Sequence, residues 1–88
     1  MGYSMESVYK LKNDKVIETI TIDGIEYEKT KEIKFHNEIY AEFRNVKEKH
    51  IVFLIQNGKE YKRVENTENF NKMLSQNYIL RNDIKILD

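Results

Sequence analysis

The stretch ETITIDGIEYEK, residues 18–29, constrains the fold more than any other part of the chain. Apolar and polar residues alternate on both sides of its Asp23-Gly24 pair, which is a strong short-range signal for a β-hairpin with a two-residue turn. In that register Ile20 faces Tyr27, and the apolar residues share one face because side chains alternate along a strand. The other face is polar. The hairpin therefore needs another part of the molecule to cover its apolar face.

Further turn signals recur along the chain, which contains no proline. They predict an antiparallel, hairpin-connected meander of about six strands. A turn at Asn13-Asp14 sets Leu11 against Val16, on the same apolar face as the central hairpin, and a bulge is expected at residues 29–31. The other turn signals are His36-Asn37, which we extend to a three-residue loop pairing Phe35 with Ile39, then Asn57-Gly58 and Asn82-Asp83.

Residues 51–55, IVFLI, form the most apolar strand, because apolar side chains occupy both of its faces. Their neighbours follow from the turns on either side of this strand. The predicted registers place Arg44 beside Val52, Glu42 beside Leu54, and Leu54 beside Tyr61.

After Glu65 the pattern changes to helical spacing. The segment NTENFNKMLSQNY predicts a short helix around residues 67–77, with Asn66 or Thr67 as its N-cap. The fold class is therefore α+β, with a further C-terminal strand in which Ile84 and Ile86 alternate. The helix is expected to cover the sheet face that bears Ile20, Tyr27, Phe43 and Phe53.

A chain of 88 residues suits a single domain, 1–88, with one modest core. Fifteen basic side chains balance fifteen acidic ones, so long-range attraction to nucleic acid or to an anionic membrane is weak. No apolar run is long enough for a signal-peptide core or a membrane span. These features predict a cytoplasmic protein without membrane contact, and the richness in Lys, Asn, Ile, Glu and Tyr fits an AT-rich bacterial or phage genome.

Residues that carry chemistry are sparse in this sequence. Cysteine is absent, and His36 and His50 lack the spacing of a zinc site. Glu26, Glu28 and Glu32 follow the stripe of a solvated sheet face, and neither a nucleophile elbow nor a glycine-rich phosphate loop is present. We therefore expect no catalytic residues, no metal site and no cofactor.

The predicted strand phase leaves a group of apolar and aromatic side chains on the sheet face away from the helix. An apolar centre surrounded by Tyr and Arg is typical of a protein-binding patch. The alternative is that the C-terminal segment, Tyr78 to Leu87, buries this group as a second core layer. The predicted partner-binding residues are Tyr40, Glu42, Arg44, Val52, Leu54, Tyr61 and Arg63.

Two kinds of binding protein fit these features. The leading hypothesis is a non-catalytic module that acts stoichiometrically on a larger partner protein, as a phage or mobile-element inhibitor of the anti-CRISPR kind does, or a small accessory protein or homodimer. The alternative is a single-stranded nucleic-acid- or RNA-binding sheet that stacks bases on Tyr40 and Tyr61. A small enzyme or metalloprotein is a third hypothesis. The phosphate contacts of the nucleic-acid binder would be Arg44, Lys59, Lys62 and Arg63, although interspersed glutamates and zero net charge argue against it.

Overall fold

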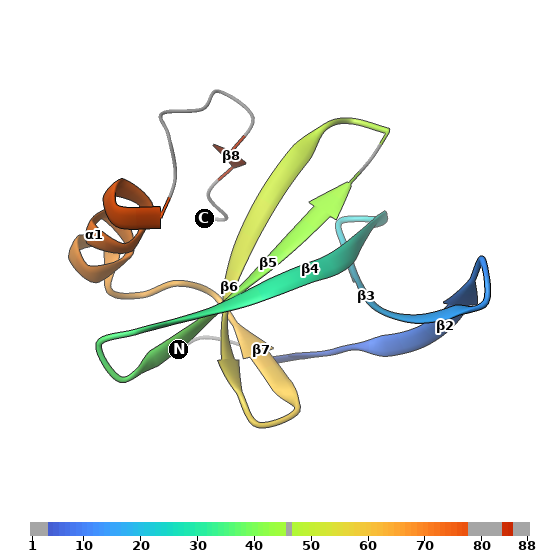
Figure 1. Cartoon of the computed structure of the whole chain (residues 1–88), viewed down its shortest axis with the longest axis horizontal. Coiled ribbons are helices and arrows are strands. Elements are labelled where there is room, and N and C mark those ends of the chain that lie inside the picture. Colours follow the sequence, from blue (N-terminus) through green and yellow to red (C-terminus); the bar gives the residue numbers. More distant parts are fainter. Residues whose placement is uncertain (1–3, 46, 78–83, 86–88) are drawn as a thin grey trace.

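The fold is taken from a computed structural model, which describes residues 4–45, 47–77 and 84–85. The expected α+β class is confirmed: an antiparallel meander carries one short helix (Figure 1). The elements are β1 (Ser4–Glu6), β2 (Val8–Lys12), β3 (Lys15–Ile22), β4 (Ile25–Phe35), β5 (Glu38–Asn45), β6 (His50–Asn57), β7 (Glu60–Lys62), α1 (Thr67–Asn77) and β8 (Ile84–Lys85).

The meander closes on itself into a small barrel. Its strands pair in the order β1-β7-β6-β5-β4-β3-β2. Between β1 and β2 stands a single residue, Ser7, so one nearly continuous stretch pairs with β7 at its start and with β3 at its end (Figure 1). The two outer members of the sheet are thus joined through the chain, and the face that curls inward becomes an enclosed core.

The hairpin turns follow from left-handed backbone conformations. Asn13 and Asp14 both have positive φ, as a type I′ turn requires, and the expected pairs on both sides of this turn and of Asp23-Gly24 are present. The bulge expected at residues 29–31 is also present. The three-residue loop expected after Phe35 is wrong. His36 and Asn37 both have positive φ and form a two-residue turn, which pairs Phe35 with Glu38.

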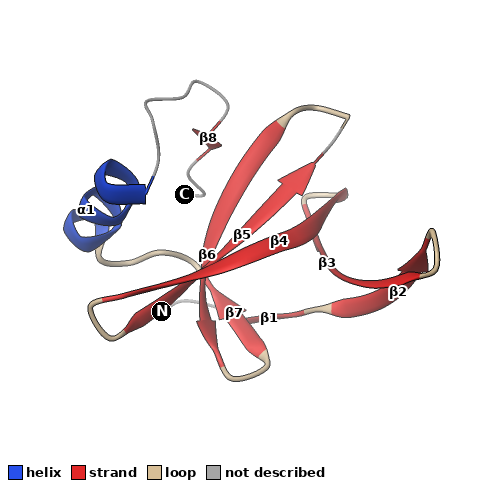
Figure 2. Cartoon of the chain, viewed as in Figure 1, coloured by secondary structure: helices blue, strands red, loops and turns tan. Residues whose placement is uncertain are grey.

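The core consists of two clusters on opposite faces of β5 and β6. The inner cluster fills the barrel, and the outer cluster lies between the barrel wall and α1. Figure 2 shows this helix, in blue, to one side of the strands. The inner cluster is Ile20, Ile22, Tyr27, Ala41, Phe43, Val52, Leu54 and Tyr61. The outer cluster is Tyr40, Ile51, Phe53, Phe70 and Met73, with Ile33, Phe35, Ile55, Val64 and Leu74 packed against it.

The predicted phase of the strands under the helix is therefore wrong. Of the four residues expected beneath α1, only Phe53 packs there. A strand that is apolar on both faces gives no signal for its register, so the turn at residues 47–49 decides it. The predicted register is displaced by one residue between β5 and β6 and by two between β6 and β7. The observed pairs are Phe43 with Val52, Ala41 with Leu54, and Gln56 with Tyr61.

The helix lies where the sequence predicts it. Asn66 is the N-cap, because its side-chain Oδ1 accepts a hydrogen bond of 3.0 Å from the backbone N–H of Asn69. Phe70 packs its ring against Phe53, with the ring centres 5.5 Å apart. The Asn69 side chain donates to the Tyr40 hydroxyl at 3.0 Å. Packing and polar contacts together hold α1 on the outside of the barrel.

The C-terminal strand is described only as β8, which pairs in parallel with Ile51 and Val52 of β6. The expected turn at Asn82-Asp83 and the alternation at Ile86 lie outside the described residues. Among the described residues, no helix has the length and apolar character needed to cross a membrane.

Candidate functional site

The predicted apolar patch is not exposed. Val52, Leu54 and Tyr61 point into the barrel as members of the inner cluster, and Tyr40 lies under α1. Each of the four is at most 1 % exposed. The burial comes from barrel closure and from the helix. These side chains present no surface to a partner in the folded chain, so the predicted exposure is wrong.

The charged residues predicted to surround that patch lie at different depths. The Glu42 carboxylate is 1 % exposed and accepts hydrogen bonds from Thr30 Oγ1 at 2.5 Å and from Arg44 Nε at 2.9 Å. Lys31 Nζ lies 3.9 Å from it. Arg44 and Arg63 are half-buried. Glu42 is therefore a buried, satisfied carboxylate of the barrel wall, and no common surface unites the seven predicted residues.

A polar cluster closes one end of the barrel. Glu18 Oε2 accepts hydrogen bonds from the Ser7 and Tyr61 hydroxyls, each at 2.5 Å. Lys29 Nζ lies 3.5 Å from Glu18 Oε1 and donates to the Tyr61 hydroxyl at 3.0 Å and to Gln56 at 2.8 Å. The cluster thus ties β3, β4, β6 and β7 to the residue between β1 and β2.

The electrostatics of this cluster favour a structural role over a catalytic one. Burial raises the pKa of Glu18, but the hydrogen bonds from Ser7 and Tyr61 and the charge of Lys29 outweigh it and hold the pKa below its usual value. Burial lowers the pKa of Lys29, but its hydrogen bonds to Glu32 and Tyr61 raise it further, so the net pKa is above normal. Burial and the bond to Glu18 raise the pKa of Tyr61 to about 12. No group in the cluster is poised near neutrality, where acid–base catalysts work best.

The feature that sequence reasoning missed is an exposed arm, which we define as residues 8–18. It comprises β2, the Asn13-Asp14 turn and the first half of β3, and it extends beyond the other strands at the right of Figure 1. Tyr9, Leu11 and Val16, the apolar strip, lie on its inner face at 67 %, 72 % and 70 % exposure. This face is continuous with the barrel interior, because Val16 and Ile20 point to the same side of β3.

The apolar face of the arm is uncovered because β3 changes its pairing partner at Thr19. Before this residue β3 pairs with β2, and after it with β4. The bulge between Lys29 and Lys31 follows the last β3–β4 pair, and a bulge bends its strand, so β4 continues along β5 without pairing with the first half of β3. At the point of divergence the side chains of Glu18 and Lys29 form the ion pair of the polar cluster. The arm is consequently a two-stranded ribbon with one apolar face open.

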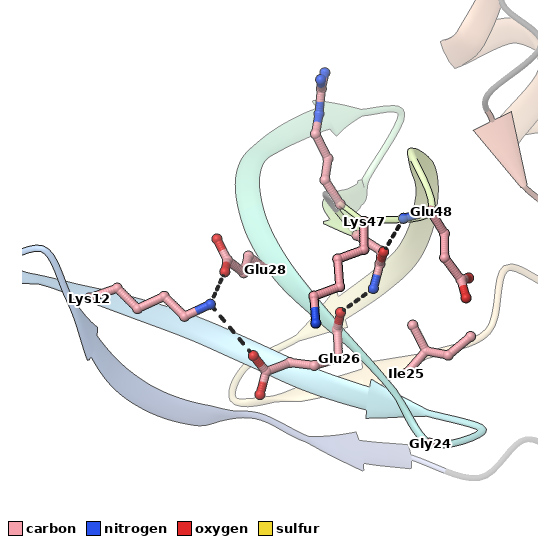
Figure 3. A pocket seen from close by; sticks show the side chains of 9 residues that line it. Lys12, Gly24, Ile25, Glu26, Glu28, Lys47 and Glu48 are labelled. Carbon is pink, nitrogen blue, oxygen red and sulfur yellow. Dashed lines mark hydrogen bonds and ion pairs between the residues drawn. The ribbon is translucent and has the colours of Figure 1, made fainter.

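The outer face of the arm carries ion pairs. Lys10 binds Glu26. Lys12 reaches between Glu26 and Glu28 (Figure 3). The hydrogen bond from Lys10 lowers the pKa of Glu26, and the bond to Glu28 raises that of Lys12. Lys12 borders an open cleft of about 500 Å³, whose charged lining is Lys12, Arg44, Lys47, Glu26, Glu28 and Glu48. Three cations and three anions leave this cleft without preference for either sign.

A metal site and a nucleic-acid-binding face find little support. Within the described ranges, His, Cys, Asp and Glu side chains do not gather in threes as a metal site would need. Tyr40 and Tyr61, the predicted base-stacking platforms, are buried. Comparisons with protein-family models, with curated proteins and with solved structures returned no match.

Proposed function

We propose that this chain is a non-catalytic protein-binding module that contacts its partner through the apolar strip of the arm. The single observation that carries the proposal is the exposure of Tyr9, Leu11 and Val16 on one face of a projecting ribbon. Contiguous apolar surface on a small protein is typical of a contact site for another protein. Such a module acts stoichiometrically, as inhibitors and accessory proteins do.

The geometry of the arm supports this function in a second way. Within the described residues β2 pairs with β3 and with no other strand, so one of its edges is open. An open strand edge next to apolar side chains is the arrangement used in β-augmentation, where a partner adds a strand to the sheet. Backbone hydrogen bonds then supply affinity, and the side chains of the strip supply specificity.

Site-specific photo-crosslinking in the cells that produce the protein tests this proposal. A photoreactive amino acid is placed at Leu11 in the strip or, as a control, at Asn71, an exposed position on α1. We expect protein adducts from position 11 and few from position 71. Equal adduct yields at the two positions would contradict the proposal, provided that circular dichroism shows both variants folded.

A further inference from the structure

We propose that the partner of the apolar strip is a second copy of this chain, which adds its own β2 to the open edge, antiparallel and centred on Lys10. This inference rests on the proposed function, because it names the occupant of the same surface. Two copies so joined share one continuous sheet, in the order β3-β2-β2-β3, across a two-fold axis.

The backbone of β2 is arranged for such pairing. In a two-residue hairpin, the residues that flank the turn exchange hydrogen bonds with each other, and the bonding alternates from there. Lys12 pairs with Lys15 beside the turn, so Lys12, Lys10 and Val8 direct their backbone groups toward β3. The N–H and C=O groups of Tyr9 and Leu11 therefore point to the open edge. On the opposite edge of the arm, which belongs to β3, Val16 is the residue whose backbone groups point outward. The β2 edge, with Tyr9 and Leu11, therefore offers more backbone hydrogen bonds to a partner.

The side chains of the edge complement themselves. Antiparallel pairing about Lys10 sets Tyr9 opposite Leu11 of the second copy, and Leu11 opposite its Tyr9. Aromatic and aliphatic side chains directly opposite each other stabilise antiparallel strands. With Val16 at either end, the two apolar strips become one continuous apolar surface across the axis. In a register displaced by one residue, the unpaired N–H and C=O groups of Tyr9 and Leu11 would face residues of the second copy whose own backbone groups already bond to its β3.

The charges also permit association of identical chains. The formal net charge is zero, so two copies do not repel each other at long range. Lys10 meets Lys10 of the second copy, but each ammonium group already binds Glu26 of its own chain. The strip itself carries no charge that would select a partner of opposite sign.

The far end of the edge offers room for the turn of the incoming arm. A cleft of about 370 Å³ lies beside Tyr9 and is lined by Glu6, Ser7, Tyr9, Lys59 and Glu60. Its two carboxylates and one ammonium leave one negative charge. At the arm's tip, Lys12 is already paired with Glu26 and Glu28 of its own chain, which leaves Lys15 and Asp14. The pairing centred on Lys10 brings this tip, with the Lys15 ammonium, to the net negative cleft.

Sedimentation of the purified chain tests the association. A five-residue edge with three apolar side chains makes a small interface, so we expect a dissociation constant of about 1–100 μM. Leu11→Asp buries a charge at the contact and is expected to weaken association at least about tenfold. Asn71→Asp adds the same charge on α1 and is expected to leave it unchanged. A wild-type chain that stays monomeric at about 1 mM overturns the proposal.

Disulfide trapping tests the register, because the natural chain has no cysteine. Residue 10 and its symmetry mate form a non-hydrogen-bonded pair with Cα atoms about 4.5 Å apart, within disulfide range. Residue 12 and its mate lie about 13 Å apart. We expect Lys10→Cys to form a covalent dimer at least about fivefold faster than Lys12→Cys, its matched control on the same strand and face. Equal rates overturn the proposed pairing.

The two proposals fail in different ways. If crosslinks from position 11 join only other proteins and the purified chain is monomeric, the second copy is excluded while the binding function stands. If position 11 gives no more adducts than position 71 and the chain is monomeric, both proposals are wrong. Adducts of twice the chain mass in cells, together with rapid trapping at position 10, support both.

Discussion

The inner cluster and the apolar strip are two stretches of one sheet face that differ in what covers them. Ile20 of the inner cluster is 2 % exposed, whereas Val16, four residues earlier on the same strand and the same side, is 70 % exposed. Both side chains point to one face of β3, where Glu18 stands between them. Alternation therefore identifies the apolar face of a strand, and only the path of the neighbouring strands decides whether that face is buried.

The difference arises at Glu18. On the C-terminal side of this residue, β4, β5, β6 and β7 complete the barrel. On its N-terminal side, beyond the bulge in β4, the two-stranded ribbon and its turn have no further strand beside them among the described residues. Substitutions of similar chemistry in the two regions are therefore expected to have effects of very different size on the free energy of unfolding. The polar cluster between them is expected to give intermediate effects.

Leu54→Ala is expected to have the largest effect. Leu54 is fully buried in the inner cluster, and truncation there leaves a cavity that costs about 2–5 kcal/mol of unfolding free energy. Urea denaturation followed by circular dichroism measures this loss. A change below about 1 kcal/mol would show that Leu54 does not lie in the core. Leu54→Asp, which places a charge at this site, is expected to leave no folded protein.

Glu18→Gln tests the boundary between the regions. The neutral amide loses the attraction of Lys29 and weakens the bonds from Ser7 and Tyr61, so a loss of about 1–2 kcal/mol is expected at neutral pH.

The pH dependence of stability gives the signature of this carboxylate. Its pKa in the folded chain lies below the ordinary value of 4.5, so its stabilisation is complete above that pH and is lost as the pH falls through the lower, folded value. Unfolding midpoints measured between neutral pH and acid should therefore fall more steeply for the wild type than for Glu18→Gln. Parallel curves would mean that Glu18 is not the group responsible.

Asp14→Gly is expected to stabilise the arm modestly. Asp14 has a φ of 62°, which glycine adopts without steric cost, so a gain of up to about 1 kcal/mol is expected despite the added freedom of the unfolded chain. Hydrogen exchange of the β2 and β3 amides detects the gain locally. Asp14→Val, with a branched side chain at the same φ, serves as the opposing control and should loosen the arm.

Leu11→Ala is expected to have the smallest effect. At concentrations low enough for the chain to be monomeric, removing an exposed side chain should change the unfolding free energy by less than about 0.5 kcal/mol. A loss comparable to that of Leu54→Ala would show that the strip is covered within a single chain, and the distinction between the two regions would disappear.

The sequence was sufficient for those parts of the fold that local chemistry determines. Turn residues with positive φ and alternating apolar positions placed β2, β3 and β4 in their correct registers, and the cap at Asn66 and helical spacing placed α1. The β5–β6 register could not be predicted, because residues 51–55 are apolar on both faces and every register would bury apolar side chains.

The candidate site was not predictable for a related reason. Leu11 and Val16 were correctly assigned to the apolar face of the sheet, but their own segment does not show whether that face is covered. Their exposure depends on the bulge at residues 29–31 and on barrel closure between β1 and β7. The predicted patch failed through the same closure, which encloses Leu54 and Tyr61.

The junction between β1 and β2 at Ser7 imposes an order on folding. Ser4 pairs with Lys62, whereas Val8, four residues later, pairs with Thr19. The ribosome therefore synthesises the pairing partner of Val8 long before that of Ser4. The hairpins from β2 to β5 can assemble as they leave the ribosome, since their contacts are close in sequence. The β1–β7 contact cannot form until residue 62 has emerged, and until then the hydrophobic interior stays open to water on one side.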